Sequence, residues 1–406
     1  MIRYLRLLAA SVFVLMAAIV AFTVAVDPYD VVGTPTRSGF NAVKHGIGRH
    51  ARTTKAYAVR HVQPQTVIFG SSRAESAFNP GHAGFAARPV YNLAFPAASL
   101  YEILRYFQHV TEVAPVREAL VSLDFGMFDA ARAKPTWDFD EKRLAVDADG
   151  HLQPLAWRDL AGLIVSGDAL RDSLWSLRHQ NRTLNTYGRD GLRDEAADIP
   201  EILNKHGGHR KTFIGNEKGF ACLFADSRDH FSFTDPVRGI DTLDIVRRLA
   251  QRARQKGVRL TLLIAPVHAR HLEVIEQSGL GPTFAEWKRR LAAVAEAEHV
   301  ALWDFAQVNS VTTEPVPLLG DQQTIMRWFR ESSHARGNAG EYALNRIYEV
   351  GPQIADYGRR LDGSDLNTVL PVDRAALENW RRGHGEDMRE IATLFSRCGM
   401  TKAEAD

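Results

Sequence analysis

The chain has 406 residues, a formal net charge of +2 at neutral pH and 45% hydrophobic residues. This length could hold two or three domains with a sizeable core, and the balanced charge gives no footprint for a nucleic-acid partner. Only two cysteines occur, Cys222 and Cys398. They lack the spacing of a metal site, and the sequence leaves open whether they pair.

The first distinctive segment is an uncharged apolar run from Leu7 to Val26. Its 20 residues match the roughly 20 needed to cross a bilayer, whereas the core of a signal peptide has typically about 7–15 residues. We therefore predict a membrane anchor in residues 1–27. A cleaved signal peptide is the alternative, because residues 21–26 are rich in small side chains.

The charges on either side of this run predict its orientation. Arg3 and Arg6 precede it, and Asp27 and Asp30 follow it. Positive charge favours the cytoplasmic side, so the N-terminus is expected in the cytoplasm. The chain would then cross the cytoplasmic (inner) membrane once, and its main domain would be periplasmic or otherwise extracytoplasmic.

An alternation of strands and helices begins after a juxtamembrane segment at 28–64. Thr66–Phe69 has the apolar character of a strand, and "PVYN" begins a second one. A helix with apolar residues at helical spacing follows, and then the strand "EALVSL", which ends near Asp124. This order favours a parallel sheet between helices. We predict an α/β fold, a three-layer α/β/α sandwich over residues 65–365.

The second half of the predicted domain is less regular. Residues 131–239 are polar and turn-rich, which indicates an insertion or a cap. The alternation then returns with a helix ended by Gly257, the strand "VRLTLLIAP", another helix, the strand "VALWDF" and a loop that leads into a last helix. A helical tail is predicted at 366–406, with one helix beyond about Pro371.

Two short motifs contain the residue types that a catalytic site needs. The first strand runs directly into "GSSR" at 70–73, and "ESSH" at 331–334 precedes the last helix of the α/β alternation. Carboxyl ends of parallel strands gather at one edge of a sheet, so these motifs are expected to meet there. A hydroxyl needs an imidazole to take its proton, and the imidazole needs an acceptor on its other nitrogen. The serine, His334 and Glu331 supply these groups.

Each motif also has a simpler explanation. Glycine and serine end strands in many proteins, so the serine could belong to an ordinary turn. His334 could start a helix with a solvated ring, and Glu331 could be a first-turn carboxylate favoured by the helix dipole. The presence of both motifs in the expected order favours catalysis.

These motifs resemble those of the SGNH (GDSL-type) hydrolase superfamily. Its nucleophile follows the first strand in a Gly-x-Ser motif, and its histidine lies near the C-terminus in an Asp-x-x-His motif. The resemblance covers roughly 66–128 and 241–350, about half the chain. It implies Ser72 as the nucleophile, His334 as the base and Glu331 in place of the usual aspartate, with neither cofactor nor metal. Ser71 takes the position of the family's supporting aspartate.

Two further blocks of the family match less closely. "VYNLAFPAAS" resembles the block that ends in an oxyanion-hole glycine, but Ala97 stands at that position. "LVSLDFGMF" resembles the strand that carries an oxyanion-hole asparagine, yet Gly126 falls at or near it. Loss of one such donor could cost about 3 kcal/mol of transition-state stabilisation. Ala97, with Asn92 from the same block, is a candidate for the oxyanion or substrate site.

Three other residues are candidates for the oxyanion or substrate site. Asp124 ends its strand at the expected edge of the sheet, where it could shape the oxyanion region or cap a helix. Arg73 could bind a substrate carboxylate or phosphate, although a surface arginine is the simpler interpretation. His268 follows a strand and could contact substrate. A zinc site from His268 and His271 lacks the further ligands that zinc requires.

A narrower resemblance includes the anchor. Membrane-tethered SGNH-like proteins of bacterial envelope acylation, in teichoic-acid D-alanylation and alginate O-acetylation, also combine one N-terminal transmembrane helix with Gly-Ser-Ser. The resemblance implies a serine-dependent O-acyltransferase or carboxylic-ester hydrolase that acts on an envelope glycan or lipid. It also implies a multi-span membrane O-acyltransferase as partner. A catalytically inactive binding or assembly subunit with the same fold is the alternative, and the acyl group and acceptor stay open.

Overall fold

The computed structural model describes residues 1–44, 46–131, 135–136, 138–154, 156–181, 187–361 and 366–398. The strands are β1 (Thr66–Phe69), β2 (Val90–Asn92), β3 (Glu118–Leu123), β4 (Arg259–Ile264), β5 (Ala301–Asp304), β6 (Phe329–Glu331), β7 (His334–Ala335) and β8 (Arg359–Arg360). The α-helices are α1 (Ile2–Val26), α2 (Gly46–Arg49), α3 (Ala51–Val62), α4 (Ser72–Ala77), α5 (Leu100–Val113), α6 (Trp157–Val165), α7 (Gly167–Arg178), α8 (Asp198–Pro200), α9 (His209–Ser227), α10 (Thr242–Lys256), α11 (Ala269–Gln277), α12 (Gly281–Ala297), α13 (Gly337–Tyr348), α14 (Leu366–Gly383) and α15 (Gly385–Ser396). Short helical turns of other types are η1 (Phe125–Phe128), η2 (Glu141–Arg143) and η3 (Glu201–Lys205).

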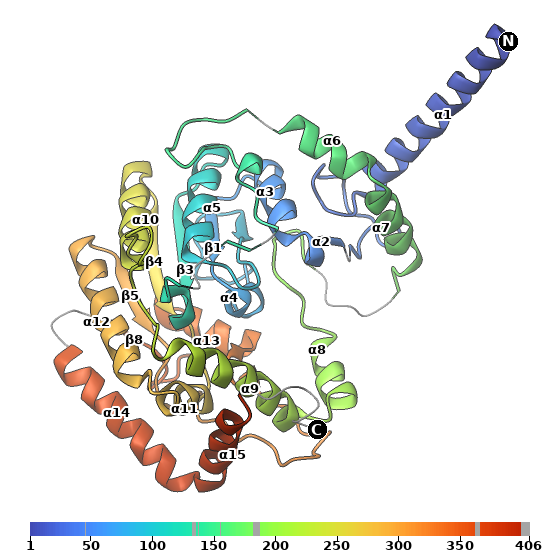
Figure 1. Cartoon of the computed structure of the whole chain (residues 1–406). Helices are drawn as coiled ribbons and strands as arrows, with labels where there is room; N and C mark the ends of the chain where they lie inside the picture. The colour runs from blue at the N-terminus through green and yellow to red at the C-terminus, as the bar shows by residue number, and fades with distance from the viewer. Residues whose placement is uncertain are drawn as a thin grey trace.

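The central sheet has the strand order β2-β1-β3-β4-β5-β8 (Figure 1). The first five strands are parallel, and β8 runs antiparallel to β5 at the edge. The predicted α/β class and the parallel pairing of β1 with β3 are therefore confirmed. From β1, the chain adds β2 on one side of the sheet and then β3, β4 and β5 on the other, so the strand order reverses between β1 and β3. Ligands of such sheets bind beyond the carboxyl ends of the two strands at the reversal.

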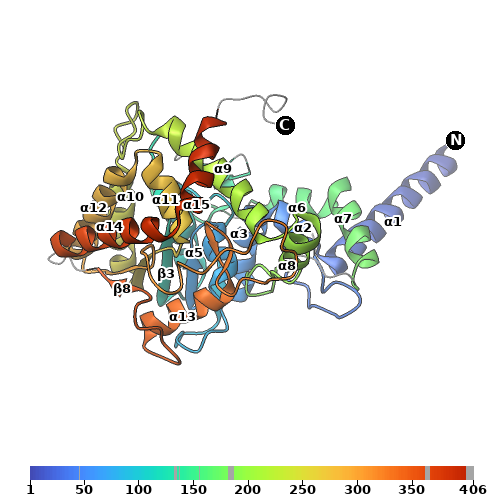
Figure 2. The ribbon, with the colours of Figure 1, turned by 90° about the horizontal axis from the view of Figure 1, so that it is seen from below.

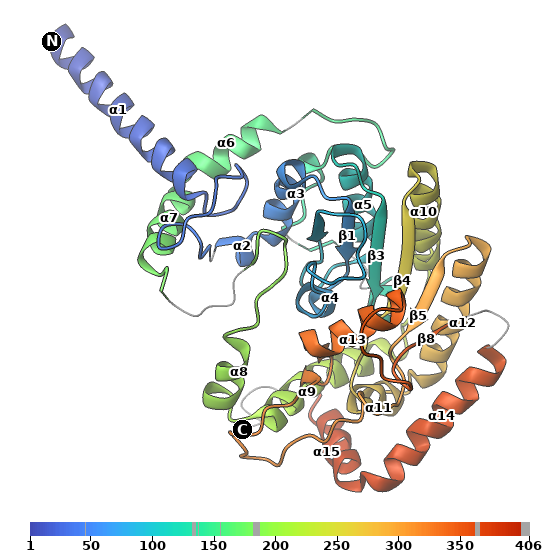
Figure 3. The ribbon, with the colours of Figure 1, turned by 180° about the vertical axis from the view of Figure 1, so that it is seen from behind.

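Alternate residues of each strand face opposite sides of the sheet, and helices cover both sides (Figures 1 and 3). Val67 and Val121 belong to one core, which α5, α10 and α12 cover. Ile68 and Leu120 belong to a second core, to which α4 and α13 contribute. Burial on both faces explains why these strands read as continuous apolar runs in the sequence.

Helix α1 projects away from the rest of the molecule, as Figures 1 and 2 both show. It is long and apolar enough to cross a membrane, which agrees with the predicted single-pass anchor. The chain leaves α1 through a tight structure at Asp27, whose carboxylate accepts hydrogen bonds from four backbone N–H groups. Asp30 forms a buried ion pair of 2.6 Å with Lys44, and the Thr34 hydroxyl donates to the carbonyl of Val24. We call this structure the collar.

The residues of the predicted insertion at 131–239 do not form one cap. α6 and α7 pack against α1, whereas α9 packs against β6, α11 and α15. The tail contains two helices, α14 and α15, where the sequence predicted one beyond Pro371. A disulfide between Cys222 and Cys398 joins α9 to the end of α15, which answers the question that the sequence left open.

Candidate active site

Ser72 is the first residue of α4, directly beyond the carboxyl end of β1. The turn requires glycine at position 70, where φ is +151° and a Cβ atom would lie 2.7 Å from the Cβ of Ala74 and 2.9 Å from that of Ser122. Ser71 caps the helix by accepting the Arg73 N–H at 3.2 Å. The turn thus presents the Ser72 side chain, which is half-buried, at the edge of the sheet.

Asn92 supports this arrangement from β2. Its side-chain amide donates to the carbonyls of Ala74 and Phe78 at 3.0 and 3.1 Å, and its oxygen accepts the Ala94 N–H. Asn92 is fully buried. The structure therefore uses this residue, an oxyanion or substrate candidate from the sequence, to hold the end of α4 in place.

His334 and Glu331 lie on a small hairpin. β6 and β7 pair antiparallel, with Glu331 opposite His334 and Ser332-Ser333 at the turn. α13 begins only at Gly337. Neither residue belongs to a helix, so the alternative of a helix-start histidine and a first-turn carboxylate is wrong.

The hairpin brings His334 to Ser72. The Ser72 Oγ lies 2.8 Å from the His334 Nε2, and the His334 Nδ1 forms a short hydrogen bond with the Glu331 Oε1. The other carboxylate oxygen of Glu331 accepts the Ser333 N–H at 2.7 Å. With Nδ1 donating to the carboxylate, Nε2 is the nitrogen that can accept the serine proton. The three candidate catalytic residues thus form one hydrogen-bonded chain.

Glu331 lies deeper in the protein than Ser72 and His334. Glu331 is 5% exposed, whereas Ser72 and His334 are partly accessible. Burial by itself raises the pKa of the Glu331 carboxyl, but the charge and hydrogen bond of His334 and the Ser333 N–H outweigh it and lower that pKa to about 2. Glu331 is therefore ionised across the physiological range.

Close packing of α13 on α4 fixes the distance between the two motifs. A Cβ atom at Gly340 would lie only 1.8 Å from the carbonyl oxygen of Ala77. The backbones of the two helices can approach this closely only because residue 340 has no side chain. Ser72 begins one helix and His334 precedes the other by three residues, so this contact sets their register.

A second polar group lies beside the first. The Ser71 hydroxyl forms a short hydrogen bond with one oxygen of Asp124, and Arg73 contacts the other at 3.2 Å. Arg73 also lies 3.3 Å from the Nε2 of His271 and packs over the ring of Phe220. Arg73 is only 9% exposed, so the interpretation as a surface arginine is wrong.

His271 completes this second group. Its ring is buried, and burial together with the charge of Arg73 holds its pKa well below the usual value. Because the ring is neutral, it does not repel the Arg73 guanidinium, which forms an ion pair with Asp124 at 3.2 Å. Asp124 and Arg73 thus lie next to the nucleophile motif. His271 was considered in the sequence only as a zinc ligand, and Phe220 on α9 was not predicted to lie here.

Ala97 has the left-handed backbone conformation, with φ of +52°. Residues with a side chain rarely adopt this region, which glycine favours. The Phe95 N–H donates to the Gly70 carbonyl at 3.1 Å and fixes this loop beside the serine turn. Among the residues that the structure describes, no protein group accepts from the N–H of Ala97 or of Ser72.

Gly126 lies in η1, just after β3, and is exposed. A Cβ atom built at this position would have no neighbour within 4 Å. The position thus has room for a longer side chain, although glycine offers no side-chain donor here.

An open cavity of about 520 Å³ adjoins Ala97. Charged and polar side chains are among its walls, and they come from the juxtamembrane residues, the segment between η1 and η2, and α7. Among them are Arg49, Arg52, Thr136 and Arg171.

His268 serves the protein's own structure. It caps α11 by accepting the Arg270 N–H at its Nδ1, and its Nε2 donates to the Glu314 carbonyl at 2.8 Å. Burial lowers the pKa of this imidazole to about 4. Both ring nitrogens are engaged inside the protein, which leaves neither for a substrate.

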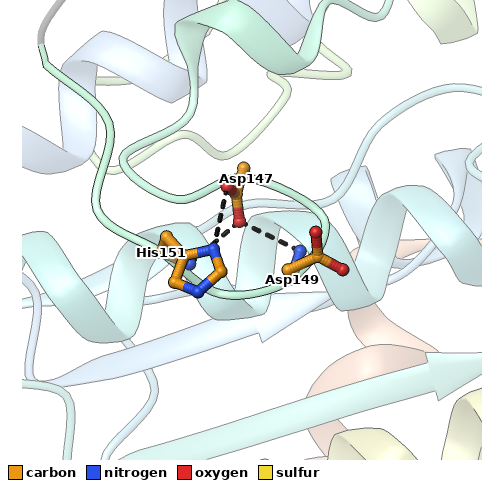
Figure 4. Close-up of side chains that lie close together, drawn as sticks. All are labelled: Asp147, Asp149 and His151. Carbon is orange, nitrogen blue, oxygen red and sulfur yellow. Dashed lines mark hydrogen bonds and ion pairs between the residues drawn. The ribbon is translucent and has the colours of Figure 1, made fainter.

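One cluster among the described residues has the composition of a cation site. Asp147, Asp149 and His151 gather on a surface turn (Figure 4). Asp147 accepts the backbone N–H groups of the other two residues, at 3.0 and 2.9 Å. Asp149 and His151 are exposed. The hydrogen bonds explain the cluster as the framework of a turn.

No protein-family model matches this chain, and no curated protein matches it significantly.

Proposed function

We propose that this protein is a serine-dependent O-acyltransferase or carboxylic-ester hydrolase that uses Ser72, His334 and Glu331. The observation that carries the proposal is the continuous hydrogen-bonded chain from the Ser72 hydroxyl through the imidazole to a buried, ionised carboxylate. An imidazole in this position takes the serine proton, and the carboxylate stabilises the imidazolium that forms.

In the proposed reaction, the Ser72 Oγ attacks the carbonyl carbon of an O-acyl group while its proton moves to His334 Nε2. The N–H groups of Ser72 and Ala97 are proposed to stabilise the oxyanion. The C–O bond to the leaving alkoxide breaks, and the imidazolium returns the proton to that oxygen. A hydroxyl of the acceptor, or water, then attacks the acyl-serine and restores the free enzyme by the same proton route.

The location and the substrate class are part of the proposal. An SGNH-type sandwich, with the site at the edge of the sheet, is consistent with the parallel order β2-β1-β3-β4-β5. The spanning helix and the disulfide support a domain on the outer side of the cytoplasmic membrane, since disulfides persist in oxidising compartments. An envelope glycan or lipid is then the proposed substrate, and a multi-span O-acyltransferase of the same membrane is the proposed partner.

The second candidate function is a binding or assembly subunit without catalysis. Gly126 favours it, because this residue supplies no side chain where the family has an oxyanion-hole asparagine. The two N–H donors at Ser72 and Ala97 would then be the whole oxyanion site. The hydrogen-bonded chain of Ser72, His334 and Glu331 supports the enzyme, and labelling can separate the two functions.

The test is labelling of the full-length protein with a fluorophosphonate probe, which reacts with activated serines. We expect the wild type to label, Ser72→Ala to lose all labelling, and Ser71→Ala to keep much of it. His334→Ala should lose labelling because the hydroxyl has no base. Absence of labelling in the folded wild type would favour the non-catalytic subunit, and loss in Ser71→Ala alone would assign the nucleophile to Ser71.

A further inference from the structure

α6 and α7 lie beside the end of α1 at which the chain enters the main body (Figures 1 and 3). The first 18 residues are all exposed. From Ile19 to Val26 most residues are partly or fully covered, and Thr23 and Val26 are buried. The two helices thus cover only the last two turns of the apolar helix.

The length of α1 places this contact at a defined depth. Its 25 residues give a length of about 37 Å, whereas the hydrocarbon core of a bilayer is about 30 Å thick. The covered stretch, Ile19 to Val26, accounts for about 12 Å of that length. The apolar run is needed almost to its end to cross the core, so α6 and α7 flank the part of α1 that lies at the outer boundary of the bilayer and just inside it.

α6 is amphipathic in a way that leaves apolar side chains without a partner. Leu160 and Leu163 pack inward on the small core around Tyr29. On another side, Trp157 and Val165 lie eight residues apart, about two helical turns, and are 69% and 41% exposed. An exposed tryptophan on a helix that packs beside a membrane span suits the aromatic belt at a membrane interface.

α7, which packs against α6, also exposes apolar side chains. Leu174 and Leu177 are 39% and 38% exposed. An open groove of about 300 Å³ runs along this helix, with Leu170, Leu174 and Trp175 among its walls and Arg171 and Arg178 beside them. Exposed acidic charge is limited here to Asp168, which pairs with Arg171 at 2.8 Å. Apolar side chains next to arginines suit the boundary between acyl chains and phosphates.

We propose that α6 and α7 form a membrane-docking face that rests on the outer leaflet of the bilayer crossed by α1. Trp157, Val165, Leu174 and Leu177 enter the acyl boundary, and Arg171 and Arg178 meet lipid phosphates. The proposal rests on α1 as a membrane span and is independent of the catalytic proposal. The docking face adjoins the membrane-spanning helix, so the surface that it contacts is lipid and not another protein.

The test uses the full-length protein in vesicles of phosphatidylcholine and phosphatidylglycerol, with one spin label in each variant. The native cysteines are paired, so an added cysteine is the site that reacts. Trp157→Cys and Leu174→Cys report on the proposed face. Val372→Cys is the matched control, because this residue is 59% exposed and apolar and lies on α14, far from α1 in Figures 1 and 2.

Oxygen concentrates in lipid, whereas a nickel chelate stays in water. Oxygen should therefore accelerate the spin relaxation of labels at 157 and 174 severalfold more than the chelate does. The label at 372 should show the reverse. Chelate access at both 157 and 174 would overturn the proposal, and so would shielding from both reagents, which indicates a protein partner such as a second copy. Arg171→Glu combined with Arg178→Glu should reduce the oxygen preference at 157, and an unchanged value would remove the arginines from the docking face.

Discussion

Glu331→Gln tests the proton path more sharply than removal of the side chain. In the wild type, one carboxylate oxygen accepts the Ser333 N–H at 2.7 Å and the other accepts the His334 Nδ1 proton. A glutamine has only one oxygen. The Ser333 N–H requires an acceptor, so the amide oxygen should take that position and the NH₂ group should face Nδ1.

This orientation forces the wrong tautomer on the imidazole. Nδ1 must then accept from the amide, so the ring proton moves to Nε2, which can no longer take a proton from Ser72. Carboxylate-to-amide changes in comparable triads reduce turnover by about 10⁴-fold, equivalent to about 5 kcal/mol of activation free energy. We expect a loss of that order in the rate of fluorophosphonate labelling.

Glu331→Ala should lose less than Glu331→Gln, although it removes more atoms. The Ser333 hydroxyl lies 3.0 Å from Nδ1 and can accept its proton when the carboxylate is gone. The assay is the pseudo-first-order labelling rate of each full-length variant, with thermal unfolding as the control for folding. Labelling of the glutamine variant at the wild-type rate would refute the assignment of Glu331 as the residue that orients His334.

Three further predictions concern stability. Because the pKa of Glu331 falls to about 2 from an ordinary value near 4.5, its ionisation stabilises the fold fully above about pH 4.5, and this contribution is lost as pH falls toward 2. The difference in unfolding free energy between wild type and Glu331→Gln, measured with urea, should shrink over that interval; a constant difference would contradict the shift. Gly340→Ala should destabilise the protein by about 1–3 kcal/mol, because its Cβ would overlap the Ala77 carbonyl, and should slow labelling of Ser72; unchanged thermal unfolding would exclude the close contact. Cys222→Ser combined with Cys398→Ser should cost roughly 2–5 kcal/mol, since the bond closes a loop of 176 residues; a variant as stable as the oxidised wild type would show that the bond adds nothing.

The sequence predicted correctly those features that depend on one continuous segment of the chain. The apolar run Thr66–Phe69, the glycine after it and the spacing of Glu331 and His334 are local patterns, and the structure has the same strand bounds and brings both motifs together. The hairpin at β6 and β7 was not predictable in this way, because two strands of three and two residues are too short to show periodicity.

Residues whose environment comes from distant segments could not be assigned from the sequence. Arg73 looked like a surface residue because its partners, Asp124 and His271, follow β3 and β4, and Phe220 comes from α9. His268 looked available because its position at the end of a strand is visible in the sequence, whereas the Glu314 carbonyl that engages its ring is 46 residues away.

The collar described at the end of α1 has a mechanical consequence. A flexible linker would let a tethered domain sweep a volume that grows with the length of the linker. Here the carboxylate of Asp27 locks the first residues after the helix, and the ion pair of Asp30 with Lys44 ties them to the next segment. Tilting of the helix is therefore transmitted to the domain as to one rigid lever. In a bilayer, the height of Ser72 above the lipid would then change only with the tilt of α1, and not with the flexing of a linker.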